Sequence, residues 1–366
     1  MSPTEFTIEL ERHISFFPVL LSTATLGILP EGSGRPAGSW RDGCVGTGPF
    51  RVVRFEPGKQ LTLEKNPSYW REGYPKSDGL VFRFGATPEE IKSEFLAGRF
   101  SLASDLLPAD AEALRHDPRF ASGYKESPRL STYYMALNAH RGPLADPLLR
   151  RRILGAIDAP SLVRRTLGRL AIPASGLIPP GLLGHNATPR PTGKPGGQAD
   201  APGRGIELVV GVHPVYRGEY AALGSELLRS LRELGFTIRP GADTMAEFLD
   251  LTRTGLMDLA IARWTGQFPD ADTFVHGLLS REGFMGRMCG TPEIERLVGR
   301  GREELDPGLR DSIYREVEEI LAKDALLLPL FHEQVYRFAR PEVEGLNVGF
   351  SAPTVRYEDL RVRAKR

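Results

Sequence analysis

The chain has 366 residues, 41% of them hydrophobic and 25% charged, and its 47 Lys and Arg against 46 Asp and Glu leave a formal net charge of +1. These values are ordinary for a globular protein of two or three domains. They provide no basic surplus that would attract nucleic acid or an anionic membrane, so we expect no nucleic-acid partner.

The first thirty residues change from an alternating to an apolar pattern. The alternation over residues 4–10 predicts a strand, and residues 16–26 are expected to form a helix. The apolar stretch 14–29 raises the question of a signal peptide, but three acidic residues stand where such a peptide carries positive charge, namely Glu5, Glu9 and Glu11. We therefore predict that this chain carries no signal peptide.

A β-hairpin is the clearest local pattern in the chain. Residues 45–70 read VGTGPFRVVRFEPGKQLTLEKNPSYW. Two runs rich in β-branched and alternating residues, 50–55 and 60–65, flank the turn residues Glu-Pro-Gly-Lys. An Asn-Pro pair then ends the second strand, and we expect Trp70 to pack as part of the framework.

The region up to residue 167 is predicted to hold further short elements. Strands are expected over 79–84 and 101–106, a helix capped by Thr87 over 87–98, a helix over 108–116, a buried strand over 131–138 and a helical stretch over 143–167. Three arginines in that stretch, 150–152, are interpreted as its solvated face rather than as a phosphate-binding patch.

The remaining two hundred residues alternate strands with helices. Residues 185–205 are rich in Gly and Pro and predict a long loop. The elements expected after it are strands at 206–212, 236–239, 257–264, 325–331 and 334–339, and helices at 220–234, 245–253, 291–299 and 307–323. Such a repeat predicts a mainly parallel α/β sheet.

The chain lacks the usual enzyme signatures. His-Glu-x-x-His, Gly-x-Ser-x-Gly, the Walker loop and Cys-x-x-Cys are all absent from the sequence. The histidines do not stand in a ligand spacing, so we expect no metal, no cofactor and no catalytic residues. Asp270 and Asp272 could do acid/base work or hold a cation, but the favoured interpretation is a helix cap. Cys44 and Cys289 are interpreted as two independent small hydrophobes, with a disulfide as the alternative.

Several segments together resemble one protein family. The combination Gly-Thr-Gly-Pro-Phe, hairpin, Asn-Pro-x-Tyr-Trp is joined by DPLLRRRILGAID at 146–158, by ARWTGQFPDADTF at 262–274 and by the run 313–331. In this order they resemble the extracellular solute-binding proteins of family 5, which are the oligopeptide, dipeptide and nickel receptors of ABC importers.

The resemblance implies a periplasmic-binding-protein-like α/β fold, with two α/β lobes joined by two hinge strands. Lobe one would comprise residues 1–136 plus 338–366 and lobe two residues 137–337, with hinge strands at 132–138 and 335–339. The family's chains are longer at the N-terminus. We therefore expect the N-terminal part of lobe one and its inserted domain to be missing, which would leave lobe one incomplete.

The resemblance also places the ligand-binding residues. Trp264 is the strongest candidate, because it ends a strand at the edge where α/β folds bind ligands; a core role is the alternative. Gln267 stands where peptide-binding members carry the Asp that pairs with the peptide's α-amino group. Met245 replaces a pocket aromatic, and Tyr134 and Asn138 lie beside the expected hinge.

The function implied is that of a substrate-binding protein of an ABC importer. It would bind a peptide or a peptide-like small solute by lobe closure, work as a monomer with the permease subunits, and reside outside the cytoplasm. The alternative is an intracellular sensor or regulatory domain of the same architecture, located in the cytoplasm and without a transport role.

Overall fold

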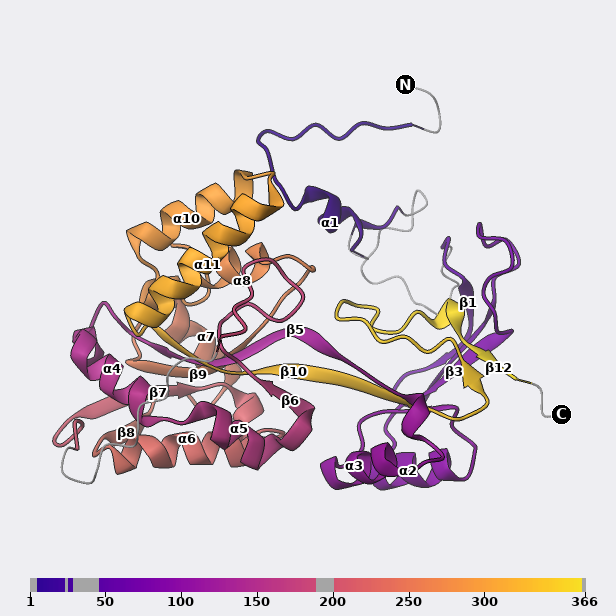
Figure 1. The fold of residues 1–366 in the computed structure, drawn as a ribbon, viewed down its shortest axis with the longest axis horizontal. Coiled ribbons are helices and arrows are strands. Elements are labelled where there is room, and N and C mark those ends of the chain that lie inside the picture. The colour runs from indigo at the N-terminus through magenta and orange to yellow at the C-terminus, as the bar shows by residue number, and fades with distance from the viewer. Residues whose placement is uncertain (1–4, 24–25, 29–45, 189–200, 364–366) are drawn as a thin grey trace. The chain divides into compact units, whose positions relative to one another are not determined.

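The computed structural model describes residues 5–23, 26–28, 46–188 and 201–363. Their contacts divide the chain into two compact units. Unit 1 comprises Met1–Thr23 and Pro128–Glu333, and unit 2 comprises Ala24–Ser127 and Gln334–Arg366. Two strands, β5 (Tyr124–Leu137) and β10 (Leu327–Ala339), run from one unit into the other (Figure 1).

This division differs from the expected lobes at the N-terminus. The sequence interpretation placed the first residues with the hairpin, whereas the contacts place them in unit 1. The reason is Phe16, which is 3% exposed and stacks on Phe268 with ring centroids 5.1 Å apart.

Unit 1 is built on a mixed sheet. Its strand order is β10-β5-β9-β7-β8, with β6 (Ala171–Pro173) antiparallel to β10. Strand β7 (Glu207–Val212) is parallel to β8 (Thr237–Pro240) and to β9 (Leu259–Thr265), but β5 runs antiparallel to β9. The prediction of a mainly parallel sheet is thus wrong for the pair β5–β9. The reason is that β5 enters from unit 2 and not through a crossover helix, which a parallel neighbour would need.

Helices cover this sheet, and one face is filled by α4, α5 and α6. Leu223, Leu227 and Leu231 repeat every four residues along α6 and join Tyr133, Leu208 and other strand residues in one apolar cluster. The helices of the unit are α1 (Phe17–Leu21), α4 (Pro147–Ala156), α5 (Ala159–Leu167), α6 (Ala221–Glu233), α7 (Met245–Thr254), α8 (Asp272–Leu279), α9 (Gly286–Cys289), α10 (Pro292–Glu303) and α11 (Pro307–Lys323).

Unit 2 contains the predicted hairpin. Strands β1 (Phe50–Glu56) and β2 (Gln60–Lys65) pair antiparallel, and β3 (Gly79–Arg83) adds to β2. The unit's other elements are α2 (Pro88–Leu96), β4 (Leu102–Ala103), α3 (Pro108–His116), β11 (Val343–Glu344) and β12 (Arg361–Val362). Thr87 caps α2 through a complete capping box with Glu90, as predicted.

Trp70 is 77% exposed, so the expectation that it packs as framework is wrong.

Two further expectations need correction. Residues 5–10 form no strand, and Phe6, Ile8 and Leu10 are 67%, 47% and 38% exposed. Alternation makes a strand only where a neighbouring strand supplies ladder hydrogen bonds, and the described part of the chain offers none here. The helical stretch at 143–167 is two helices, because Asp158 caps α5 by accepting the N–H of Ser161 at 3.1 Å and Pro160 interrupts the ladder.

Arg150 is buried, and its place on a solvated face was predicted wrongly. It is 5% exposed and donates to the carbonyl oxygens of Leu144 at 2.8 Å, Ala145 at 3.1 Å and Asp324 at 2.9 Å. The guanidinium thereby satisfies carbonyl groups at the ends of two other elements, η4 (Pro143–Ala145) and α11.

Replacing Arg150 with methionine is expected to lower the free energy of unfolding by about 2–3 kcal/mol, because buried carbonyl groups lose their donors. Urea denaturation followed by circular dichroism would measure it. The matched control is Arg151→Met, at the exposed neighbouring position, where a change within about 0.5 kcal/mol is expected. Equal losses in the two variants would contradict a specific role for Arg150.

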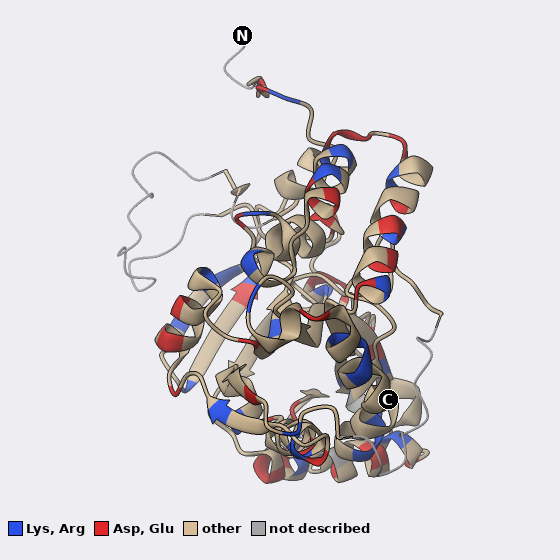
Figure 2. Ribbon diagram, turned by 90° about the vertical axis from the view of Figure 1, so that its left-hand side faces the viewer, with Lys and Arg blue, Asp and Glu red and all other residues tan. Residues whose placement is uncertain are grey.

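Charges of both signs are mixed along the long helices α10 and α11, as Figure 2 shows. This agrees with the near-zero net charge of the sequence. Within the described residues, every helix is too short or too polar to cross a lipid bilayer.

Cys289 ends α9 and is completely buried. Its thiol lies 3.4 Å from the carbonyl oxygen of Leu326 and 3.6 Å from that of Leu137. Burial raises the pKa of Cys289 to about 12. Cys289 is a free cysteine, and its possible partner Cys44 lies outside the described residues.

Candidate functional site

The candidate site is at the end of strand β9, a central strand of unit 1. Residues 259–262 are fully buried, and the strand ends at Thr265, so that Trp264 stands at its margin and is partly buried. The indole Nε1 donates to the carbonyl oxygen of Thr273 at 2.6 Å, and the ring lies 5.6 Å from that of Phe284. Because its only donor is engaged, Trp264 offers a ligand an aromatic surface rather than a hydrogen bond.

Helix α8 lies directly against this indole. A Cβ atom added to Gly277 would lie 2.7 Å from Cζ2 of Trp264, which is closer than such atoms approach. Glycine is therefore required on this face of α8 for the ring to keep its position.

Gln267 lies in the loop between β9 and α8. Its backbone N–H donates to Oγ1 of Thr273 at 3.2 Å, while its side chain is exposed. Among the described residues the carboxamide has no hydrogen-bond partner, so both its donor and its acceptor are free for a ligand. Thr273 thus fixes Trp264 and Gln267 together.

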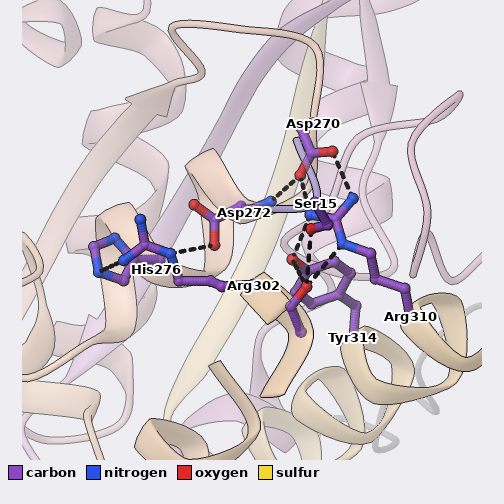
Figure 3. Close-up of polar contacts among 8 residues, drawn as sticks. Ser15, Asp270, Asp272, His276, Arg302, Arg310 and Tyr314 are labelled. Atoms are coloured by element: carbon purple, nitrogen blue, oxygen red, sulfur yellow. Dashed lines mark hydrogen bonds and ion pairs between the residues drawn. The ribbon is translucent and has the colours of Figure 1, made fainter. Parts of the chain in front are cut away.

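A buried ion pair holds the far end of the loop. Both oxygens of Asp270 accept from Arg310 of α11, at 2.6 and 2.7 Å, and the two side chains are 9% and 6% exposed (Figure 3). Arg310 also donates to the hydroxyl of Tyr314 at 2.8 Å. The bidentate geometry is the strongest form of this pair. Asp270 also accepts the N–H of Asp272 at 2.8 Å, so the predicted helix cap is found only in part.

Asp272 has a weaker partner in the same network. Its Oδ1 lies 3.4 Å from Nε of Arg302, which is too long for a good hydrogen bond, and the residue is 3% exposed. Burial raises the pKa of Asp272 from 3.8 to about 6, against the opposing attraction of Arg302. Arg302 also donates to Nε2 of His276 at 2.7 Å (Figure 3). Burial, followed by the Arg302 charge, lowers the pKa of His276, so the ring is neutral.

The N-terminal segment closes this network. The N–H of Ser15 donates to the carbonyl oxygen of Arg302 at 2.9 Å. The Phe16 ring lies under the guanidinium groups of Arg302 and Arg310, at 5.5 and 5.9 Å from its centroid. Through these cation–π contacts and its stacking on Phe268, Phe16 packs against the loop that carries Gln267 and stabilises it.

The other sequence candidates occupy different environments. Met245 begins α7 and is 41% exposed; Phe248 on the same helix reaches Trp264 through Phe284, whose ring lies 6.2 Å from that of Phe248. Met245 stands one turn before Phe248 on this helix.

Tyr134 and Asn138 are both fully buried. Tyr134 pairs with Ala262 and so shares a sheet face with Trp264, and burial raises the pKa of its hydroxyl well above the ordinary value. Asn138 donates to the carbonyl oxygens of Gly255 at 3.0 Å and Met257 at 2.8 Å and accepts from the N–H of His140. Both side chains are covered by the rest of the described chain, and the Asn138 amide holds the backbone of the turn after α7. Their part in ligand binding stays a prediction.

Sequence reasoning missed the residues that support the site. Arg302, Arg310 and Tyr314 lie on helices whose charge pattern is that of a solvated face, and Phe16 lies some 250 residues from its partner. The one available signal was the spacing of Arg310 and Tyr314, four residues apart on one helix face. Among the described residues no group of three or more His, Cys, Asp and Glu could hold a metal ion.

Comparison with known proteins identifies the family. The sequence matches the profile of the bacterial extracellular solute-binding proteins, family 5 Middle, over residues 2–286. The chain belongs to this family. Family 5 is a family of solute-binding proteins, and the matched range includes the hairpin, Trp264 and the loop after it.

Individual family 5 members resemble the chain over most of its length. It is 26% identical to the probable di/tripeptide-binding protein 5 of Pseudomonas aeruginosa, covering 88% of this chain and 62% of that protein. It is 19% identical to the periplasmic oligopeptide-binding protein OppA of Salmonella typhimurium, covering 93% and 65%. The chain therefore spans less than two thirds of the length of these curated relatives.

Solved family 5 structures show the same fold. The clavulanic acid biosynthesis oligopeptide binding protein 2 is similar with a TM-score of 0.83 at 22% identity, over 100% of this chain and 72% of that one. The Helicobacter pylori protein DppA, in complex with the peptide STSA, is similar with a TM-score of 0.73 at 20% identity, over 95% and 70%. The expected periplasmic-binding-protein-like α/β fold is confirmed.

Proposed function

We propose that this chain is the substrate-binding component of an ABC importer and binds a peptide or a peptide-like solute. The observation that carries the proposal is the arrangement of Trp264 and Gln267 at the end of β9, where both are held by Thr273 within the range that matches the family profile. The names of the relatives support a peptide over a sugar or a metal ion. The same names favour the transport function over the sensor alternative. We accordingly propose an extracytoplasmic location and ABC permease subunits as partners.

The side chains suggest how a peptide would be held. The Trp264 ring and Met245 would contact an apolar side chain, and the Gln267 carboxamide would hydrogen-bond the peptide backbone. The supporting ion pair Asp270–Arg310 keeps the loop in place before the ligand arrives, which lowers the ordering cost of binding. Movement of the two units about the shared strands β5 and β10 would be the binding motion.

Tryptophan fluorescence tests the proposal directly. The chain has three tryptophans, so Trp40→Phe and Trp70→Phe together leave Trp264 as the only emitter. A saturable change in emission with di- to tetrapeptides, absent with maltose and with Ni²⁺, is the expected result. Native mass spectrometry of the purified protein would detect a peptide that co-purifies. No change with any peptide, and no co-purified ligand, would overturn the proposal.

Gln267→Asp is expected to tighten binding of peptides with a free N-terminus by about tenfold or more. The new carboxylate would form a charge-assisted hydrogen bond with the peptide's α-ammonium, which contributes about 1.5–3 kcal/mol. Isothermal titration calorimetry with a tripeptide and its N-acetylated form would measure the difference, and Gln267→Asn is the matched control. Equal affinity of Gln267→Asp and wild type for the free peptide would show that Gln267 does not face the N-terminus of the ligand.

A further inference from the structure

A cavity lies within unit 1, on the side of the sheet covered by α4 and α5. It has a volume of about 340 Å³ and is bounded by α4, α5, β6, β10 and the end of α11. None of its lining residues belongs to the Trp264 site. Its volume falls at the lower end of the range of small-molecule pockets, roughly 300–1,000 Å³.

The walls of this cavity are apolar and its charges are of one sign. Ile157, Leu328 and Pro329 are buried residues that contribute apolar wall, and proline and alanine side chains make up much of the rest. The only ionisable lining residues are Arg151 and Arg164, so no lining carboxylate is present to neutralise them.

Both guanidinium groups have hydrogen-bonding capacity to spare. The side chain of Arg164 forms no hydrogen bond or ion pair with the residues that the structure describes. The side chain of Arg151 makes one long contact, 3.5 Å from Nε to the carbonyl oxygen of Lys323. Asp158 accepts the N–H of Ser161 as the cap of α5. This hydrogen bond contributes most to the lowered pKa of Asp158, and the charge of Arg164 adds a smaller attraction without a direct ion pair. An anion that enters the cavity would therefore meet two guanidinium groups that form no direct ion pair with a described carboxylate.

Helix geometry directs these groups to the cavity. Arg151 and Gly155 are four residues apart on α4, and Pro160 and Arg164 are four residues apart on α5, so each pair shares one helix face. Gly155 contributes open space: a Cβ atom built on it would meet no atom within 4 Å. The cavity thus has a charged rim on two helices and an unfilled position between them.

We propose that this cavity is a second binding site, for a small organic anion with an apolar chain, such as a medium-chain carboxylate. The carboxylate would pair with Arg151 and Arg164, because guanidinium groups match carboxylates in a bidentate fashion. The chain would be buried against Leu328 and Ile157. A zwitterionic peptide fits poorly, because its ammonium group would meet two arginines and find no carboxylate among the lining residues. The site is therefore distinct in chemistry from the proposed peptide site and does not depend on it.

Calorimetry with octanoate tests the proposal on the full chain. Saturable binding of octanoate is expected, with binding at least about tenfold weaker for 1-octanol, which lacks the charge, and for acetate, which lacks the chain, each tenfold being ~1.4 kcal/mol. Octanoate is also expected to leave the Trp264 emission and the peptide affinity unchanged. Absence of octanoate binding, or equal binding of octanol, would overturn the proposal.

Variants at Gly155 locate the site. Gly155→Leu would fill the cavity and is expected to weaken octanoate binding at least about tenfold, with peptide binding unchanged. Gly155→Ala adds only a methyl group at a position that favours helix, and serves as the control for folding. Arg151→Gln and Arg164→Gln are each expected to weaken binding about tenfold. Octanoate binding that survives both Gly155→Leu and the double arginine variant would show that the anion binds elsewhere.

Discussion

Asp270→Asn is expected to lower the free energy of unfolding by about 3–5 kcal/mol, the largest single loss among the substitutions considered. The asparagine keeps the shape of the side chain but leaves Arg310 as a buried charge without its carboxylate. The loss is expected to be large because both Asp270 oxygens accept hydrogen bonds from Arg310, at 2.6 and 2.7 Å, and water cannot replace them where both side chains are almost completely buried. The loop that carries Gln267 should loosen with it, so peptide affinity should fall as well.

Urea denaturation of wild type and variant would measure this loss. The matched control removes both charges, in the double variant Asp270→Leu with Arg310→Met. Since replacing a buried pair by apolar residues of similar volume is often neutral, the double variant should recover most of the stability. A double variant less stable than Asp270→Asn would contradict the explanation, because the loss would then reflect shape rather than an uncompensated charge.

Asp272→Asn, only two residues away, is expected to have the opposite effect and raise stability at pH 7 by up to about 3 kcal/mol. Burial raises the pKa of Asp272 in the folded state from 3.8 to about 6. Each unit of that difference corresponds to ~1.4 kcal/mol. Near pH 7 the carboxyl of Asp272 must be ionised while it is buried. Its single long contact with Arg302 does not fully offset the free-energy cost of that desolvation. Asparagine removes this cost.

The pH dependence gives the sign of the effect. Below about pH 3.8 the carboxyl is protonated in both states, and the variant and wild type should be equally stable. Between pH 3.8 and about 6 the unfolded state loses its proton first, so wild type loses stability relative to the variant as the pH rises. Above about 6 the difference should be constant. Denaturation at pH 4, 5, 6 and 7 would measure this course, and a gap that closes as the pH rises would contradict it.

Local chemistry explains which parts of the fold were predictable. The hairpin at β1 and β2, the capping box of α2 and the leucine stripe of α6 depend on neighbours within a few residues, and all three were predicted. The expected strand at residues 4–10 is not found over the described residues 5–10, because a strand needs a partner that alternation alone does not supply.

Buried charges were the least predictable feature. Arg150 lies in a run of three arginines that looks identical in sequence, yet only its position on α4 faces carbonyl groups of two other elements. Arg310 likewise sits on a helix full of charges, and its partner Asp270 is 40 residues away. Which charge is buried depends on packing between elements, and no local pattern records it.

The candidate site remains a prediction in its centre, and its supporting residues were not predicted. Trp264 was chosen for its place at the end of a strand and Gln267 for its place in the resemblance to family 5, and the structure joins them through Thr273. Asn138 was a candidate because it ends a strand beside the expected hinge. Its amide donates to the carbonyl groups of Gly255 and Met257 after α7, a contact between distant elements that no local pattern indicates.

The burial of Cys289 makes this thiol a reporter of its surroundings. With no exposed surface and a pKa raised to about 12, the sulfur cannot react with an alkylating reagent while unit 1 is closed around it. Modification would require opening of the structure, so the rate of labelling in a Cys44→Ser background measures how often that core opens. Ligands of either proposed site that stabilise the unit should slow this labelling. One labelling assay can therefore detect both kinds of ligand, even where binding changes no fluorescence.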